Sequence, residues 1–208
     1  MGRSRGARRQ HGRWLVALAT AAAAASLATG ASAAKAPKTE FRALKPVADT
    51  YVTAARPRTN FGSAAVLRVD GAPEATAYLR FRLKGIPGEI TSVTLLLRPV
   101  TAGRASYAVR QVGEGHWRER RLTYVNAPEP SLRYASSKPI RRGVWSAIDV
   151  TSFVASAGSE EIGLAITTRG SRELSFGSRE SQNGPRLVVR FERPGHLNDR
   201  VLDALGRR

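Results

Sequence analysis

Arginine side chains recur on the polar positions of several alternating segments of this chain. In residues 78–83, for example, three apolar side chains alternate with Tyr78, Arg80 and Arg82. A planar guanidinium pairs with a carboxylate through two parallel hydrogen bonds, so a row of arginines suits a polyuronide that repeats one carboxylate per sugar. The candidate binding residues are therefore Arg56, Arg58, Arg68, Tyr78, Arg80, Arg82 and Arg110. The alternative is a solvated, arginine-rich surface with no ligand.

Three acidic residues lie near predicted strand ends and are candidate calcium ligands: Asp49, Asp70 and Asp149. Calcium takes roughly 6–8 oxygen ligands from carboxylates and carbonyls. No ligand spacing connects the three, and Asp149-Val150-Thr151 is more typical of a turn in which side chains cap backbone N–H groups. A structural calcium ion is therefore a secondary hypothesis, and no other cofactor is expected.

The residues that could support catalysis are few. Residues 34–208 contain two histidines, His116 and His196, and the sequence contains no cysteine. No nucleophile elbow, zinc-binding His-Glu-x-x-His motif or phosphate loop is present. A polysaccharide lyase would need a base, a proton donor and a group that neutralises the carboxylate; His116, Tyr124 and an arginine are the available set. We therefore expect a protein that binds without catalysing a reaction.

The elements that position these residues are short segments of period-two alternation between Gly, Pro and Asn turns. Such regular spacing is typical of a β-sandwich or barrel. The predicted fold is all-β, with about nine strands near residues 47–53, 66–70, 76–83, 90–98, 105–112, 144–150, 161–168, 173–178 and 186–192. No sustained helical periodicity precedes His196. Alternation places apolar side chains on the core face of each strand and arginines on the other.

The first 33 residues have the features of a secretory signal peptide. Five arginines precede an Ala-rich apolar run from Trp14 to Gly30, and Ala31-Ser32-Ala33 supplies a small-x-small cleavage pattern. A membrane anchor would need roughly 20 strongly apolar residues. We expect a secreted, extracellular protein, exported by the general or the twin-arginine route. The rest divides into a linker at residues 34–45, one domain at 46–193 and a tail at 194–208.

Charge and cysteine content limit the classes of partner. The chain has 34 Lys and Arg against 16 Asp and Glu; without the five leader arginines its net charge is +13. Such a field favours anionic partners, of which acidic polysaccharide is preferred here over specific nucleic-acid binding or stable membrane insertion. Without cysteines, a secreted domain of this size depends on its hydrophobic core. We expect a monomer.

Two segments, residues 116–128 and 145–154, join polar residues at fixed positions to strand-like alternation. A Trp can cover the open end of a sandwich, while Glu and Asn side chains satisfy backbone groups of an irregular connection. We therefore interpret as structural Trp117, Glu119, Thr123, Asn126 and Pro128. The alternative is that Trp117 or Tyr124 stacks on a sugar ring. Arg179 and Glu180 are expected to form an internal pair.

Together with these two segments, four further motifs resemble the DNRLRE-domain group, also classified as carbohydrate-binding module family 96. They are Ala48-Asp49-Thr50-Tyr51-Val52 with Thr59-Asn60-Phe61-Gly62 and Leu67-Arg68-Val69-Asp70-Gly71; Tyr78-Leu79-Arg80-Phe81; Ile90-Thr91-Ser92-Val93-Thr94-Leu95; and Leu174-Ser175-Phe176-Gly177-Ser178-Arg179-Glu180-Ser181 with Pro185-Arg186-Leu187-Val188-Val189.

The resemblance implies a jelly-roll antiparallel β-sandwich, usual in secreted bacterial proteins, with alginate binding in some members. Those members often adjoin a polysaccharide lyase, and this chain carries no such domain. The expected function is therefore non-catalytic binding of an anionic polysaccharide such as alginate. The alternatives are a cell-surface or matrix structural module without a specific glycan, and a lyase.

Overall fold

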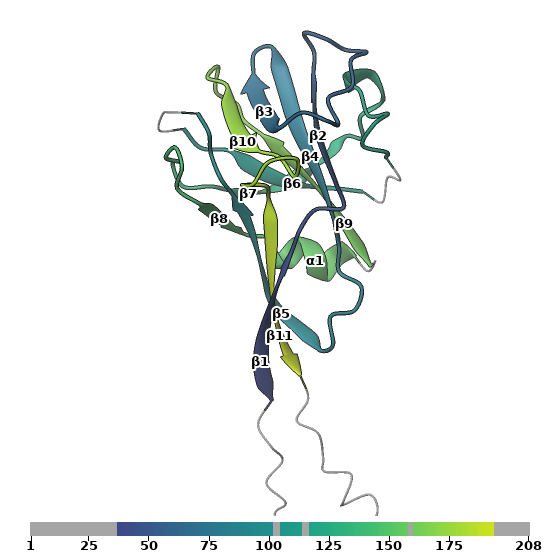
Figure 1. The fold of residues 1–208 in the computed structure, drawn as a ribbon, viewed down its shortest axis with the longest axis vertical. Coiled ribbons are helices and arrows are strands. Elements are labelled where there is room, and N and C mark those ends of the chain that lie inside the picture. Colours follow the sequence, from purple (N-terminus) through teal and green to yellow (C-terminus); the bar gives the residue numbers. More distant parts are fainter. Residues whose placement is uncertain (1–36, 102–104, 114–116, 158–159, 194–208) are drawn as a thin grey trace, which may run out of the picture. The chain divides into compact units, whose positions relative to one another are not determined.

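The computed structural model describes residues 37–101, 105–113, 117–157 and 160–193, which lie within one compact unit of the chain (Figure 1). Two antiparallel sheets form a β-sandwich. In chain order the elements of the described residues are β1 (Lys38–Leu44), β2 (Ala48–Thr53), β3 (Val66–Gly71), β4 (Glu74–Arg82), β5 (Glu89–Leu97), β6 (Ala108–Val112), the 3-10 turn η1 (Tyr124–Asn126), β7 (Pro130–Ser136), β8 (Ser146–Asp149), α1 (Thr151–Ala157), β9 (Glu161–Thr167), β10 (Leu174–Gly177) and β11 (Arg186–Arg193).

The smaller sheet has the strand order β1-β11-β5-β8, and the larger sheet has the order β10-β3-β4-β9-β6-β7. Strand β2 pairs with β4 and lies off that path. Strand β3 pairs with β4 only beside their connecting turn, at Asp70 and Gly71. Beyond this turn β3 pairs with β10 instead, so Arg68 lies opposite Ser175 and not beside Arg80.

The core lies between the two sheets and follows the alternation of their strands. On β4, Leu79 and Phe81 are fully buried, and Leu95 on β5 and Val189 on β11 meet them from the smaller sheet. Burying one such side chain stabilises a fold by about 1.5–3 kcal/mol, so this layer supplies the stabilisation that disulfides would otherwise add.

Residues 117–128, which we call the covering loop, form an additional layer on the other face of the larger sheet. We call the part of the sheet beneath this loop the covered region. Trp117 and Leu122 from this segment pack in a second apolar cluster with Val52 of β2, Tyr78 of β4 and Val112 of β6. Because Tyr78 alternates with Leu79 and Ala77, it points away from the main core. The outward face of the sheet is thus covered by a loop at its centre, and only its margins are open to solvent.

All nine predicted strand positions are occupied by strands, and the all-β antiparallel sandwich is confirmed. The structure adds β1 and β7, which are mostly exposed edge strands. The prediction of a linker at residues 34–45 is therefore wrong in part, since Lys38–Leu44 forms a strand that pairs with β11. The structure also contains a short helix, α1, that the sequence pattern did not indicate. Helix α1 is only seven residues long, too short to show a helical period in the sequence.

The predicted leader at residues 1–33 and tail at 194–208 lie outside the described residues. Among the residues that are described, no helix has the length and apolar character needed to cross a membrane.

Candidate functional site

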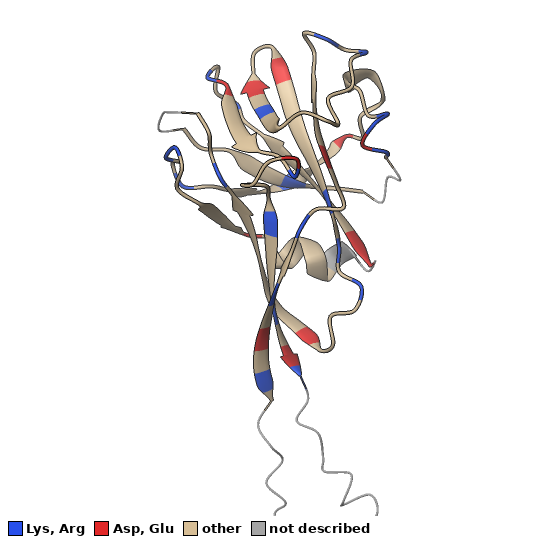
Figure 2. Ribbon diagram, in the orientation of Figure 1, with Lys and Arg blue, Asp and Glu red and all other residues tan. Residues whose placement is uncertain are grey.

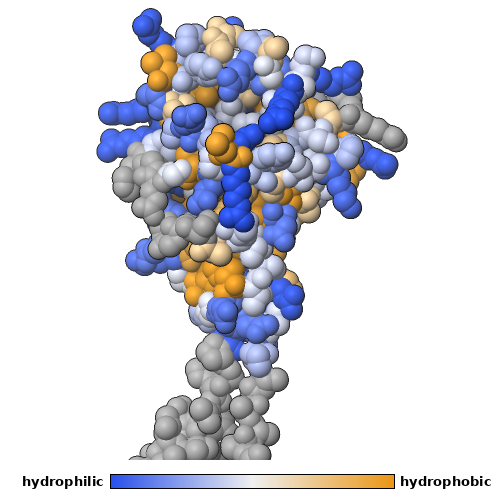
Figure 3. Space-filling view, turned by 180° about the vertical axis from the view of Figure 1, so that it is seen from behind, coloured by the Kyte–Doolittle hydropathy of each residue, from blue (hydrophilic) through white to orange (hydrophobic). Residues whose placement is uncertain are grey.

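Hydrophilic side chains cover most of the face shown in Figure 3, whereas apolar atoms gather toward the end nearer β1 and β11. Basic positions occur on β3 and β6 and on several connecting loops (Figure 2). The predicted arginines are thus spread over different parts of the larger sheet, and their surroundings decide what each can bind.

Arg80 and Arg82, on the outward face of β4, are paired within the protein. Both approach Glu161 of β9: the Nε of Arg80 lies 3.6 Å from its carboxylate and the Nη2 of Arg82 lies 2.9 Å away. Arg80 also donates a hydrogen bond of 3.0 Å to the carbonyl oxygen of Trp117, with its guanidinium 5.4 Å from the Trp117 ring. These contacts fix the covering loop, and they leave Arg80 little capacity for a ligand.

Tyr78 is likewise part of the covered region. It is 3% exposed, and its hydroxyl donates a hydrogen bond of 2.9 Å to the carbonyl oxygen of Pro128. Burial raises the pKa of this phenol, so the hydroxyl stays protonated as a donor. The Tyr78 ring packs edge-on against Trp117 and is not available for stacking on a sugar.

A cavity of about 320 Å³ opens between β2, β3 and the loop that joins them; we call it the β2–β3 cavity. The Tyr51 and Phe61 rings stack at 4.3 Å with an interplanar angle of 18°, forming one wall. Charged side chains complete the lining: Arg56, Arg68, Asp70 and Glu173. A concave site with an aromatic wall and a few convergent polar groups is typical of small-ligand recognition.

The loop of residues 54–65 holds Phe61 over Tyr51 through a fixed set of contacts. Asn60 donates its side-chain amide to the carbonyl oxygens of Glu119 and Leu122, both at 2.7 Å. Gly62 follows, and any side chain there would collide with the Glu119 backbone. The Thr59-Asn60-Phe61-Gly62 motif therefore ties this loop to the covering loop and presents the aromatic ring to the cavity.

The charges of the β2–β3 cavity are unequally compensated. Arg68 lies 3.4 Å from Glu173 in an exposed pair, which contributes little to stability. The Arg56 guanidinium has no hydrogen bond or ion pair with any described residue. Burial raises the pKa of Tyr51 although Arg68 and Arg56 both lower it, so its hydroxyl remains neutral beside these cations. The cavity therefore offers one unpaired guanidinium to an anion.

The two remaining predicted arginines lie elsewhere. Arg58 is exposed on the same loop and does not line the cavity. Arg110, on β6, stands over Tyr134 of β7 at 5.1 Å from the ring centroid. A second, smaller cavity adjoins this pair. The candidate arginines are thus divided among the β2–β3 cavity and its loop, the strand β4 and the β6–β7 margin.

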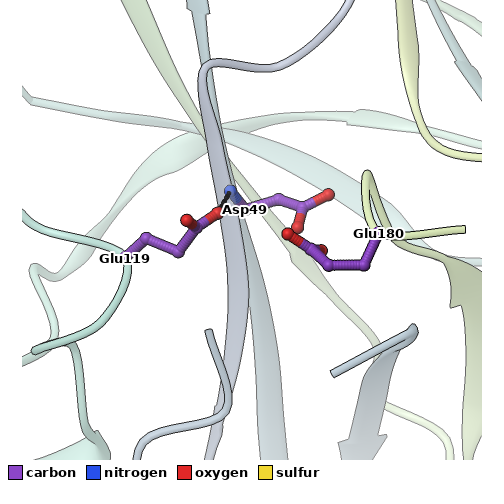
Figure 4. A group of neighbouring side chains, drawn as sticks. All are labelled: Asp49, Glu119 and Glu180. Atoms are coloured by element: carbon purple, nitrogen blue, oxygen red, sulfur yellow. Dashed lines mark hydrogen bonds between the residues drawn. The ribbon is translucent and has the colours of Figure 1, made fainter. Parts of the chain in front are cut away.

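Asp49, Glu119 and Glu180 bring carboxylate oxygens within 4.8 Å of one another (Figure 4). The backbone N–H of Asp49 donates to Glu119 at 2.8 Å. Between the acids lies Arg179, whose Nε is 3.1 Å from Glu119 and 3.0 Å from Glu180. The guanidinium already supplies the positive charge that a metal ion would bring, and the internal Arg179–Glu180 pair is confirmed.

Asp49 is the unusual member of this cluster, because it is 1% exposed and one of its oxygens, Oδ1, has no hydrogen-bond partner among the described residues. Burial raises the pKa of Asp49 to about 7, and the charges of Glu180 and Glu119 add to this effect. In Glu180 burial acts in the same direction, but hydrogen bonds from Arg179 and Ser178 outweigh it and lower the pKa.

The predicted calcium ligands do not come together. Asp70 accepts hydrogen bonds from the backbone N–H groups of Gly71 and Ala72 in the β3–β4 turn. Asp149 accepts one from Thr151 at 2.8 Å, and the Thr151 hydroxyl accepts one from Val93, as the capping interpretation predicts. The acidic group that includes Asp49 is completed by Glu119 and Glu180 instead, which the sequence did not indicate.

The structural interpretation of residues 117–128 agrees with the contacts. Trp117 is 8% exposed, and Asn126 accepts from Thr123 and donates to Arg121. The Tyr124 hydroxyl donates to Glu74 at 3.0 Å. His116, the base that a lyase would require, lies outside the described residues.

A comparison with protein families matches residues 40–191 to the model of carbohydrate-binding module family 96. This range spans well over half of the chain and contains both cavities, the covering loop and the acidic cluster. No curated protein is similar enough in sequence to count as a relative.

Proposed function

The chain belongs to carbohydrate-binding module family 96, and from this we propose that it binds an acidic polysaccharide such as alginate, without cleaving it, in the β2–β3 cavity. The observation that carries the proposal is the unpaired Arg56 beside the stacked Tyr51 and Phe61 rings. The guanidinium pairs with a uronate carboxylate, while the half-buried Phe61, supported from behind by the buried Tyr51 ring, receives the apolar face of the sugar ring.

The composition of the chain supports this choice of ligand. Its excess of basic residues attracts polyanions generally, whereas the cavity selects a ring that carries a carboxylate. We propose that the protein acts outside the cell as a monomer, after export directed by its Arg-rich, Ala-rich leader. Arg68, paired weakly with Glu173, can reorient toward a second carboxylate of the same chain.

The test is a panel of glycans titrated calorimetrically at low and moderate salt. Alginate and polygalacturonate oligosaccharides are expected to bind more tightly than a neutral glucan and more tightly than dextran sulfate or single-stranded DNA. Affinity is expected to fall as salt rises, because exposed charges are screened within about 10 Å at 0.1 M. Equal binding to every polyanion would contradict a uronate-specific site and favour a module held in place by charge alone.

Phe61→Ala separates the cavity from general charge, because it removes half of the aromatic wall and leaves the net charge unchanged. Binding of uronate oligosaccharides is expected to weaken at least about tenfold, equivalent to roughly 1.4 kcal/mol. The matched control is Val125→Ala, an exposed apolar residue on the covering loop, which is expected to bind as the wild type does. Full affinity of the folded Phe61→Ala protein would place the site elsewhere.

A further inference from the structure

The smaller cavity at the margin of the larger sheet, which we call the β6–β7 cavity, repeats the chemistry of the β2–β3 cavity. Its volume is about 200 Å³, and its lining includes Arg110, Tyr134, Thr167, Thr168 and Arg169. Tyr134 is 51% exposed, so much of its ring is open to solvent although the Arg110 guanidinium stands over it. The volume lies below the usual range for extended ligands, roughly 300–1,000 Å³, and suits a single sugar ring.

Arg110 is held in a defined position without losing its charge. Its Nε donates to the Thr167 hydroxyl at 3.3 Å, and its Nη1 donates to the carbonyl oxygens of Ser131 and Leu132 at 2.9 and 3.1 Å. All three acceptors are neutral, and no described acidic residue pairs with Arg110. The Nη2 group has no partner among the described residues, so a fixed guanidinium with an unused donor is part of the cavity lining.

A second cation stands at the same cavity. Arg169 is exposed on the loop between β9 and β10, and its side chain contacts no acidic residue of the described chain. The loop itself is fixed, since Thr168 donates to the carbonyl oxygen of Ser106 and Gly170 accepts from Gly71 at 3.1 Å. Two guanidinium groups, a half-exposed tyrosine and several hydroxyls thus converge on a space of one ring.

The two cavities are separate, because no residue lines both of them. Arg110 pairs with Ala165 and Ala165 pairs with Tyr78, so Arg110 lies on the outward face of the larger sheet. The β2–β3 cavity lies at the end of the sheet where β3 leaves β4, since β3 pairs with β4 only at Asp70 and Gly71. The two cavities can therefore hold two separate glycan segments.

We infer that the β6–β7 cavity is a second binding site for a carboxylate-bearing sugar, and that one molecule bridges two segments of acidic polysaccharide. The inference rests on the proposed function, because it takes the ligand class from it. Arg110 and Arg169 bind the carboxylate, and Tyr134 contacts the ring. A module with two sites gains avidity on a polymer and cross-links chains, which a module with one site does not.

The first experiment counts the sites by calorimetry with an alginate tetrasaccharide. The wild type is expected to bind two equivalents, and Arg110→Lys combined with Arg169→Ala is expected to bind one. Lysine loses the planar pair of donors that binds a carboxylate. It keeps the positive charge and the aliphatic part of the Arg110 side chain, so β7 is expected to stay folded. Arg169→Ala alone, an exposed substitution, is expected to weaken only the second equivalent by about tenfold or more.

The second experiment measures cross-linking with long-chain alginate by light scattering. Wild-type protein is expected to form large complexes at less than one molecule per chain, and the Arg110→Lys, Arg169→Ala variant is expected to form none. Arg142→Ala, an exposed arginine outside both cavities, is the charge-matched control for one substitution. The molar mass of the free protein in solution checks that cross-linking does not come from a dimer.

The outcomes separate the two claims. One equivalent in the wild type, lost on Arg56→Ala and unchanged in the Arg110→Lys, Arg169→Ala variant, overturns the second site and leaves the proposed function in place. One equivalent that is lost only in the latter variant overturns both the two-site arrangement and the assignment to the β2–β3 cavity. No binding of any uronate overturns the proposed function together with the inference.

Discussion

The covered region of the larger sheet and its two open margins use the same residue type for different purposes. Beneath residues 117–128, Arg80 lies between Glu161 and the Trp117 ring. Its guanidinium is neutralised by Glu161 and holds the covering loop through Trp117. At the margins, Arg56 and Arg110 lie beside aromatic rings, and neither has an acidic partner in the part of the chain that the structure describes. An arginine next to an aromatic ring is therefore a candidate ligand contact only where no carboxylate of the protein neutralises it.

The covering loop accounts for this difference. It places Trp117 over Tyr78 and excludes solvent from the centre of the sheet, where the arginine must then be paired. The margins have no such cover, and an unpaired guanidinium there is solvated at little cost until a ligand replaces the water. The comparison predicts that the centre governs stability and the margins govern binding.

The largest effect on stability is expected from Trp117→Ala, which removes the buried ring of the covered region. The loss should be about 3–5 kcal/mol in the free energy of unfolding, as for other large-to-small substitutions of buried aromatic residues. Tyr134→Ala is the matched control, because an arginine also lies over this ring but the residue is half exposed. The loss in the free energy of unfolding should stay below about 1 kcal/mol. Urea unfolding followed by fluorescence measures both.

Equal losses in the free energy of unfolding for the two aromatic substitutions would contradict the difference between the covered centre and the open margins. The folded fraction of Trp117→Ala should also keep its affinity for uronate oligosaccharides at the β2–β3 cavity. A loss of affinity in that fraction would mean that binding depends on residues 117–128, either directly or through the hydrogen bonds by which Glu119 and Leu122 hold Asn60 next to Phe61.

A smaller effect is expected from pH through Asp49. Its pKa of about 7 in the folded protein exceeds the 3.8 of a free side chain, so the folded state binds more protons between these values. The free energy of unfolding should therefore be highest near pH 4 and fall by roughly 2–4 kcal/mol toward pH 7. The lowered pKa of Glu180 acts with the opposite sign, but only below about pH 4.5.

Asp49→Asn tests this prediction, because the amide keeps the acceptor for Arg179 and carries no charge. Unfolding in urea at several pH values should show no fall between pH 4 and 7 in this variant. Asp70→Asn, in the exposed β3–β4 turn, should keep the wild-type dependence. A wild-type protein that becomes more stable over the same interval would contradict the assignment to Asp49.

The fold was predictable because its signals are local. Alternation in residues 78–83 identifies the inward face of β4, and the capping role of Asp149 and Thr151 follows from side chains two residues apart. Strand β1 was not predicted, because most of its side chains are exposed and show no apolar alternation. It is held in a strand conformation by pairing with β11, about 150 residues later in the chain. The sequence contains no local signal of such a pairing.

The site was only partly predictable, because pairing across the sheet decides which arginines are free. Arg80 and Arg110 have the same place in the alternation, but only Arg80 has Glu161 beside it, brought there by the register of β4 and β9. The stacking of Phe61 on Tyr51 likewise depends on the path of the loop. An aromatic residue following Arg56 and Arg58 in a polar loop was the available signal.

The most direct test compares Arg56→Ala with Arg82→Ala, two exposed arginines that change the net charge equally. The measurement is the affinity of each variant for an alginate oligosaccharide in calorimetry at fixed salt. Arg56→Ala should weaken the β2–β3 site at least about tenfold, since hydrogen bonds to charged groups contribute roughly 1.5–3 kcal/mol, while Arg82→Ala should change affinity less than about twofold. Equal losses, or a larger loss in Arg82→Ala, would contradict the division between paired and unpaired arginines.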